Sequence, residues 1–326
     1  MRRREFVAGL GSAVAWPLAA RAQQSAMPVI GLLSAAGPEV FNSARQSAFR
    51  RGLSESGYVN AQNILFEYRW AEGQFDRLGA LASDLIQRRV AVVVATGVTS
   101  ARVAKVASSV IPILVMAGDD PVKFGLVASL NRPGGNVTGL NLMTSELAAK
   151  RLGLVRQLVS TPTIVAILSN PKSPESEPQI RDLVTAASTI GQEIHVLSAS
   201  TESDIRTAFG SLVQPAAGAL VVTNDPFLYT QRDQIVALAA QHAIPAIYDR
   251  SEYTAIGGLI SYGTNYVDGY RQIGAYAGRI LTGDNPADLP VMQPTKFSLA
   301  INLKTAKALD LPVPPNLLAL ADEVIE

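Results

Sequence analysis

The sequence predicts an α/β protein made of two doubly wound parallel-sheet lobes that are joined by three crossover strands. Short β-branched and apolar runs alternate with amphipathic stretches of helical period, which is typical of βαβ units. The alternation then starts again, because residues 163–169 repeat the apolar, serine-ending form of residues 28–34. A chain of 326 residues, 48% of them hydrophobic, is long enough for two such lobes.

The first series of elements begins at residue 28. Residues 28–34 form a near-continuous apolar run, as in a parallel strand that is covered on both faces. A helix is expected over residues 42–56, with Gly57 as its stop signal. The other expected elements are strands at 64–68, 91–95 and 113–117 and a helix at 74–88.

The second series repeats this order after the strand expected at residues 163–169. Its other elements are expected to be helices at about 176–190 and 204–213 and strands at 194–197, 219–222 and 245–248.

Three stretches are expected to carry the chain between the lobes, at residues 131–139, 257–263 and 296–302. The first two are rich in glycine, which suits a turn next to a strand. A ligand cleft is expected between the lobes, at the ends of the strands. The resulting boundaries are 27–139 plus 264–289 for the first lobe and 140–263 plus 290–326 for the second.

Residues 1–22 have the features of an export signal. Arg3 and Arg4 precede a short apolar run, which ends in an A-x-A cleavage site at Ala22. Together with Phe6, the two arginines match a twin-arginine pattern, although a plain basic start for the general export route is the alternative. A buried amphipathic first helix is the other interpretation of this segment. We expect a periplasmic protein that is cleaved after Ala22.

The composition argues against several classes of protein. The chain carries 28 basic and 27 acidic residues, so it lacks the basic excess of a nucleic-acid binder. It has no cysteine for disulfides, thiolate metal sites or lipid attachment. After Ala22 no apolar run approaches the ~20 residues of a membrane span. We expect a monomer that binds no nucleic acid and has no membrane anchor.

Enzyme motifs are mostly absent. The sequence has no nucleophile elbow, no phosphate-binding loop and no glycine-rich dinucleotide loop after a strand. Its histidines are His195 and His242, and neither has a second histidine or a carboxylate at metal-binding spacing. We therefore expect no catalytic activity, no cofactor and no metal.

Polar residues follow the ends of several expected strands. Ser34 ends the first strand, and residues 96–100 follow the third strand and open a helix. The N–H groups of a helix start, with the hydroxyls of Thr99 and Ser100, are suited to an anion such as a carboxylate. Simple helix capping is the alternative and is compatible with ligand binding.

Acidic residues follow two other strands. Asp120 and Asp225 each precede a proline, so each is a candidate helix cap. We favour the cap for Asp120. For Asp225 we favour contact with an ammonium group of a ligand.

Aromatic side chains gather near the strand ends of the second lobe, at Phe227, Tyr229, Tyr248, Tyr253 and Tyr262. Each alone is more typical of a core, but their shared position favours the wall of a cleft for a small amphoteric ligand. The residues predicted to contact the ligand are Ser34, Trp70, Thr96, Gly97, Thr99, Ser100, Gly118, Asp119, Asn170, Asp225, Tyr248, Asp249 and Tyr262.

Four motifs resemble a known family: AEGQ at 71–74, DPVK at 120–123, NRPGGNVTG at 131–139 and PTKF at 294–297. The chain resembles the TrpX-like ABC transporter substrate-binding proteins over nearly its whole length. This resemblance implies a type I periplasmic binding fold, with three crossover strands between two lobes. It also implies capture of a small solute for a membrane permease and its ATPase.

The resemblance extends to the ligand site. By analogy with related amino-acid receptors, a ligand carboxylate meets the loops at 96–100 and 117–119, and an ammonium meets Asp225 or, alternatively, Asp249. An amino acid, possibly aromatic or branched, or a related organic acid is the implied ligand. A sensor module for a membrane histidine kinase and an exported enzyme are the rival interpretations.

Overall fold

The structure, a computed structural model, describes residues 27–159, 164–212 and 217–326. The expected export signal, residue Thr163 of an expected strand and residue Val213 of an expected helix lie outside these ranges. None of the helices among the described residues has the length and apolar character that a membrane crossing requires.

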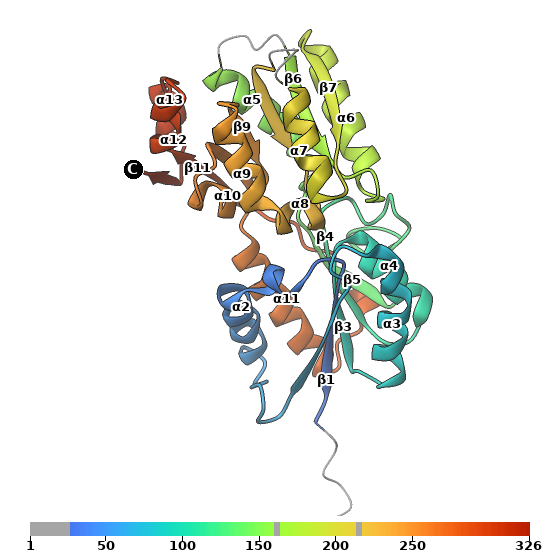
Figure 1. The fold of residues 1–326 in the computed structure, drawn as a ribbon. Helices are drawn as coiled ribbons and strands as arrows, with labels where there is room; N and C mark the ends of the chain where they lie inside the picture. The colour runs from blue at the N-terminus through green and yellow to red at the C-terminus, as the bar shows by residue number, and fades with distance from the viewer. Residues whose placement is uncertain (1–26, 160–163, 213–216) are drawn as a thin grey trace, which may run out of the picture.

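Within the described residues, five parallel strands form the sheet of the first lobe (Figure 1). Their order is β2-β1-β3-β4-β5, so that β2 and β5 form the two edges and the first strand of the chain, β1, lies inside the sheet. The strands are β1 (Val29–Ser34), β2 (Leu65–Trp70), β3 (Val92–Thr96), β4 (Ile113–Ala117) and β5 (Val137–Asn141).

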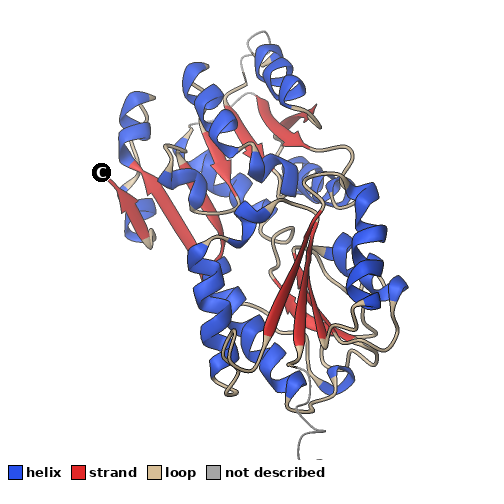
Figure 2. Ribbon diagram, turned by 60° about the horizontal axis from the view of Figure 1, so that its bottom comes forward, coloured by secondary structure: helices blue, strands red, loops and turns tan. Residues whose placement is uncertain are grey.

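Helices cover both faces of this sheet (Figure 2). Side chains alternate across β3, so that Val92 and Val94 pack beneath α2 (Ser43–Ser54) and α11 (Tyr266–Leu281). Val93 and Ala95 pack against α3 (Leu78–Gln87) and α4 (Val98–Ala107) on the other face. The short helices η1 (Pro38–Phe41) and η2 (Phe75–Arg77) precede α2 and α3 in the chain.

Helix α11 follows most of the second sheet in the sequence, yet it packs along α2 in the first lobe. Two glycines allow this close approach. A Cβ atom at Gly274 would overlap the carbonyl oxygen of Phe49, and one at Gly52 would overlap the carbonyl oxygen of Arg271. The two helix backbones therefore touch where larger residues would separate them.

In the part of the chain that the structure describes, seven strands form the second sheet, in the order β12-β11-β10-β9-β8-β6-β7. Its strands are β6 (Ile164–Ser169), β7 (Glu193–Ser198), β8 (Ala219–Val222), β9 (Ala246–Tyr248), β10 (Ile260–Thr264), β11 (Phe297–Asn302) and β12 (Glu323–Ile325). Its helices are α5 (Ala148–Leu158), α6 (Ser176–Thr189), α7 (Glu202–Ser211), α8 (Pro226–Thr230), α9 (Arg232–Gln241), α10 (Glu252–Ala255), α12 (Leu303–Ala308) and α13 (Pro315–Ala319).

The predicted fold class is confirmed, with two refinements. The three stretches expected to cross between the lobes overlap β5, β10 and β11. Each of these strands belongs to a single sheet, and the crossing itself lies next to the strand. The chain crosses between β5 and α5, between β10 and α11, and between η3 (Pro286–Asp288) and β11. Because β11 re-enters the second sheet from the end at which β10 leaves it, β11 runs antiparallel to β10.

Candidate ligand site

A cavity lies between the two lobes, at the carboxyl ends of strands from both sheets. The ends of parallel strands meet at one edge of a sheet, which is where ligands of open α/β sheets bind. Loops after the strands and residues of α2, α8 and α11 line this cavity. Its described lining is Ser34, Ala36, Val40, Arg45, Thr96, Gly97, Met116, Gly118, Leu142, Glu175, Asn224, Pro226, Tyr229, Arg250, Tyr266 and Tyr270.

Strand ends of the first lobe supply small residues to the lining. Ser34 ends β1, Thr96 ends β3 and Gly118 follows β4. Gly97, the N-cap of α4, has a φ of +89°, a conformation that favours glycine. A Cβ atom at Gly118 would lie 3.1 Å from the amide oxygen of Asn224 in the second lobe. The backbone of the first lobe therefore closely approaches the opposite wall.

The start of α4 binds a carboxylate of the opposite lobe. Glu175 lies between β6 and α6, and its Oε1 accepts hydrogen bonds from the backbone N–H and the hydroxyl of Thr99, each at 3.2 Å. Gly97 provides no side-chain cap for α4, and a helix N-terminus favours negative charge. The anion site predicted at residues 96–100 thus contacts the Glu175 carboxylate.

Two buried carboxyl groups from opposite lobes interact beside this helix start. The pKa of Glu175 is raised to about 7, first by burial and then by the charge of Asp119, against the hydrogen bonds from Thr99. Burial also raises the pKa of Asp119 to about 6, although the hydroxyl of Ser145 donates to its Oδ1. Oδ2 of Asp119 has no hydrogen-bond partner among the described residues. No group of three or more His, Cys, Asp or Glu in the described ranges is placed to hold a metal ion.

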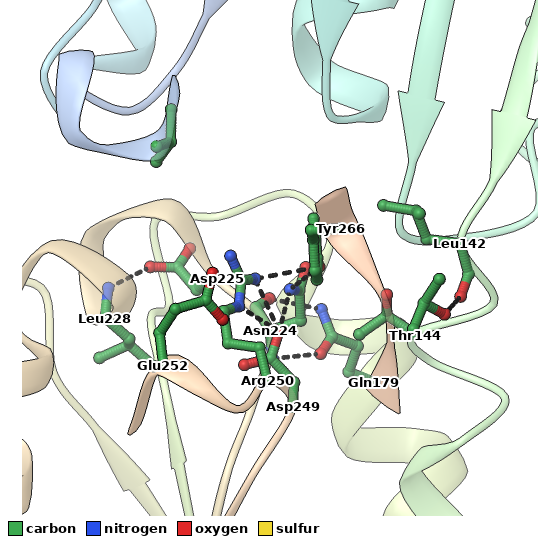
Figure 3. Close-up of polar contacts among 12 residues, drawn as sticks. Leu142, Thr144, Gln179, Asn224, Asp225, Leu228, Asp249, Arg250, Glu252 and Tyr266 are labelled. Atoms are coloured by element: carbon green, nitrogen blue, oxygen red, sulfur yellow. Dashed lines mark hydrogen bonds and ion pairs between the residues drawn. The ribbon is translucent and has the colours of Figure 1, made fainter. Parts of the chain in front are cut away.

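A polar network forms the wall of the second lobe (Figure 3). Oδ2 of Asp249 accepts hydrogen bonds from Nε and Nη2 of Arg250 at 2.9 and 2.6 Å, and from Nδ2 of Asn224 at 2.5 Å. Nη2 of Arg250 also donates to the hydroxyl of Tyr266 on α11, at 3.1 Å. Gln179 fixes the backbone of Asn224 with two hydrogen bonds, at 2.9 and 3.0 Å. The network therefore joins α6, two strand ends and a helix of the first lobe.

The Asp249–Arg250 pair is almost completely buried, with side-chain exposures of 2% and 8%. Burial alone raises the pKa of Asp249, but the charge and hydrogen bonds of Arg250 outweigh it and lower that pKa below its ordinary value. Burial lowers the pKa of Arg250, but the charge and hydrogen bond of Asp249, together with the charges of Tyr266 and Glu252, outweigh it and raise that pKa well above its ordinary value. Both side chains are thus held in their charged forms.

Arg45 of α2 forms a second polar contact between the lobes. Its Nη2 pairs with Glu252 of α10 in the second lobe. Its guanidinium carbon lies 5.5, 5.0 and 6.0 Å from the ring centroids of Tyr229, Tyr266 and Tyr270. The charge of Arg45 is therefore surrounded by aromatic rings that also line the cavity.

The structure brings part of the predicted site to the cavity. The predicted residues that line it are Ser34, Thr96, Gly97 and Gly118. Thr99 lies outside the lining and bonds Glu175. Ser100 is completely buried, and its hydroxyl has no partner among the described residues. Asp119 is buried beside Gly118 without lining the cavity.

Three predicted polar residues are placed outside the lining. Asp225 is the N-cap of α8, where its Oδ1 accepts a hydrogen bond from the backbone N–H of Leu228 at 2.9 Å. Asn170 donates to the same oxygen at 3.2 Å. Asp249 faces Arg250 instead of the cavity. For Asp225, the capping alternative is therefore what the structure contains.

Three predicted aromatic residues pack in or against core clusters and do not line the cavity. Tyr248 stacks on Tyr253, with ring centroids 4.4 Å apart, and Trp70 stacks on Tyr68 at 5.9 Å. Tyr262 packs against the core cluster that contains α5. Side chains of a strand point to the faces of the sheet, so an aromatic near a strand end need not face the cleft.

Tyr229, which was expected among the aromatic residues near strand ends, lines the cavity, and six other polar or aromatic residues of the lining were not among the predicted ligand contacts. Glu175, Asn224 and Arg250 follow β6, β8 and β9, so the strand-end rule that selected Ser34 applies to them as well. The other three lie on helices, where no sequence pattern distinguishes them from core or surface positions. They are Arg45 on α2 and Tyr266 and Tyr270 on α11.

Residues 41–325 match the family described as ABC transporter substrate binding protein. The chain belongs to this family. The resemblance drawn from its motifs is therefore confirmed. A similar protein is the tyrosine-binding protein of Clostridioides difficile strain R20291, which is 29% identical over 268 residues, covering 82% of this chain and 76% of the relative.

Solved structures share the fold. A domain from Streptococcus pneumoniae in complex with L-Trp has a TM-score of 0.81 and 21% identity, over 92% of this chain and 100% of its own. The ligand-free, open structure of a substrate-binding protein with adhesive properties from Clostridium difficile has a TM-score of 0.66 and 25% identity, over 91% of this chain and 99% of its own.

Proposed function

We propose that this protein is the solute-binding component of an ABC importer and that it captures an aromatic amino acid between its lobes. The lining of the cavity carries the proposal, because its described residues include one carboxylate, two guanidinium groups and three tyrosine rings. An ammonium, a carboxylate and an aromatic side chain complement these groups. The tyrosine-binding relative supports the choice of an aromatic amino acid.

The ammonium group of the ligand is proposed to meet Glu175. The carboxylates of Asp225 and Asp249, which the sequence suggested for this role, are already bound within the second lobe. Glu175 lines the cavity, and no described residue donates a hydrogen bond to its Oε2. A cation beside Glu175 favours its ionised form and so reverses the effect of burial.

The carboxylate of the ligand is proposed to meet the loops at residues 96–100 and 117–119. Thr96, Gly97 and Gly118 line the cavity there. The dipole of α4 favours an anion at its N-terminus, beside the Thr99 N–H that already binds Glu175. The carboxylate of the amino acid would then contact the first lobe at the start of α4. Its ammonium would contact Glu175 of the second lobe, which lies next to that helix start.

Ligand binding is proposed to stabilise the closed arrangement of the lobes. Glu175–Thr99 and Arg45–Glu252 are contacts between lobes, and they break when the cleft opens. The higher TM-score to the L-Trp complex than to the open structure supports a closed arrangement in this chain. A ligand that contacts both walls favours this state over the open one.

The proposed partners are a membrane permease and its ATPase, which receive the loaded protein in the periplasm. Membership of a transporter family favours this role over the sensor role that the same fold allows. Cleavage after Ala22 remains part of this proposal.

Glu175→Gln tests the proposed contact with the ammonium group. Because a charge-assisted hydrogen bond is worth ~1.5–3 kcal/mol, we expect about 10- to 150-fold weaker binding of L-tyrosine by calorimetry at pH 8. Glu177→Gln is the matched control, since Glu177 is exposed on the first turn of α6 and does not line the cavity. Unchanged affinity in Glu175→Gln would exclude this contact, whereas an unmodified protein that binds no amino acid would exclude the ligand class.

A further inference from the structure

Arg45 carries a hydrogen-bond donor that the protein leaves unpaired. Its side chain is 1% exposed and lines the cavity. Nη1 donates to the carbonyl oxygen of Val40 at 2.7 Å, and Nη2 pairs with Glu252. Nε has no hydrogen-bond partner among the described residues.

A buried donor without an acceptor is unusual in a folded protein, because its lost hydration is not replaced. The tyrosine rings around Arg45 interact with the charge through their faces and leave the Nε–H donor without an acceptor. The hydroxyl of Tyr266 accepts hydrogen bonds from Asn224 and Arg250 instead. An acceptor from a molecule in the cavity would satisfy the donor.

Arg45 and Glu175 contact different parts of the cavity wall. Glu175 bonds the start of α4, whereas Arg45 is held by Val40 and lies among the rings of Tyr229 and Tyr270. An aromatic amino acid whose ammonium meets Glu175 can pack its ring against these tyrosines. The far end of that ring then lies toward Arg45.

We propose that Arg45 determines specificity by donating a hydrogen bond from Nε to an acceptor oxygen at the far end of the ligand's aromatic ring. The inference rests on the proposed capture of an aromatic amino acid. The site then selects a ring with a hydroxyl group, as in tyrosine, over the bare ring of phenylalanine. A site with a buried donor discriminates in this way because the analogue without the oxygen leaves that donor unpaired.

The test is the ratio of the dissociation constants for L-phenylalanine and L-tyrosine, measured by calorimetry. We expect a ratio of about 10 to 100 in the unmodified protein, from the cost of one unpaired buried donor. Arg45→Met removes every N–H donor and should bring the ratio close to one, and Arg45→Lys, which has no donor at the Nε position, should lower it. The third ligand, 4-amino-L-phenylalanine, matches tyrosine in size but has a poor acceptor, so it should bind like phenylalanine.

Glu252→Gln separates recognition of the ligand from closure of the lobes. This variant removes the charge of the residue that pairs with Arg45 in the second lobe and keeps Nε, so it should weaken binding of both amino acids alike and preserve their ratio. A ratio near one in the unmodified protein, or one that persists in both Arg45 variants, would overturn the assignment. If neither amino acid binds the unmodified protein, the proposed function fails and the inference fails with it.

Discussion

The two lobes build their walls of the cavity in different ways. The strand ends of the first lobe supply backbone and small residues, such as Gly97 and Gly118, at places where a larger side chain meets strain or the opposite wall. The second lobe supplies Glu175, Asn224 and Arg250, which are held by hydrogen bonds and an ion pair. At the strand ends, the first lobe therefore shapes the cavity through backbone geometry, whereas the second lobe does so through a network of charged and polar side chains.

This difference predicts which kind of substitution disturbs each wall of the cavity. A backbone wall is sensitive to side-chain volume, even where no charge changes. A charged network is sensitive to the loss of a single partner, even where the volume is unchanged. Substitutions in the two lobes can therefore be matched to these two causes.

The largest effect is expected from Asp249→Asn in the second lobe. The substitution keeps the size of the side chain but leaves the charge of Arg250 buried without its ion-pair partner. We expect a loss of about 3–5 kcal/mol in the free energy of unfolding, measured by denaturant titration. Asp268→Asn is the control, because the Asp268–Arg271 pair on α11 is exposed and should contribute little. Equal losses in the two variants would contradict the charged-network account.

A smaller effect is expected from Gly274→Ala in the first lobe. The added methyl group overlaps the carbonyl oxygen of Phe49, so α11 must move away from α2. We expect a loss of about 1–3 kcal/mol in the free energy of unfolding. Gly153→Ala on α5 has no neighbour within 4 Å of the new atom and should leave stability unchanged or slightly improved. If Gly274→Ala left the free energy of unfolding unchanged, the contact between α2 and α11 would have to adjust to the added methyl group without cost.

A third effect is a pH dependence that arises where the two walls meet. Glu175 has a pKa of about 7 in the folded protein against an ordinary 4.5, so the folded state retains its proton between these values. The contribution of Glu175 to the free energy of unfolding is full below about pH 4.5 and is lost as the pH rises through about 7. Asp119 and Asp225, each with a pKa of about 6, act in the same direction from their ordinary 3.8 upward.

Glu175→Gln should therefore flatten the fall in stability between about pH 4.5 and 7, measured by chemical denaturation without added amino acid. Glu177→Gln removes an exposed carboxylate of the same helix and should keep the original slope. The same slope in Glu175→Gln and the unmodified protein would show that Glu175 does not carry this effect.

The fold was largely predictable because it depends on local patterns. Apolar runs that end at Ser34 and Ser169 mark β1 and β6, and the strict alternation of elements predicts parallel sheets. The reversed direction of β11 was not predicted, because it depends on where the chain re-enters the second sheet. Periodicity contains no information on such a long-range step.

The site was predictable only where it depends on strand ends. Ser34, Thr96 and Gly118 line the cavity because parallel strands deliver their ends to it. Tyr248 followed the same rule and packs in the core instead, because strand side chains point to a face of the sheet. Arg45 reaches the cavity through the packing of α2 against the first sheet, which no sequence motif marks.

The return of α11 to the first lobe also bears on the order of folding during synthesis. The core of that lobe includes Tyr270, Ile273 and Ala277, which the ribosome adds only after β6 to β10. At about 5–20 residues per second, making those strands and the helices between them takes on the order of ten seconds. The lobe that is made first therefore completes its core late. A chain that stops before residue 266 would expose the apolar face that α11 covers.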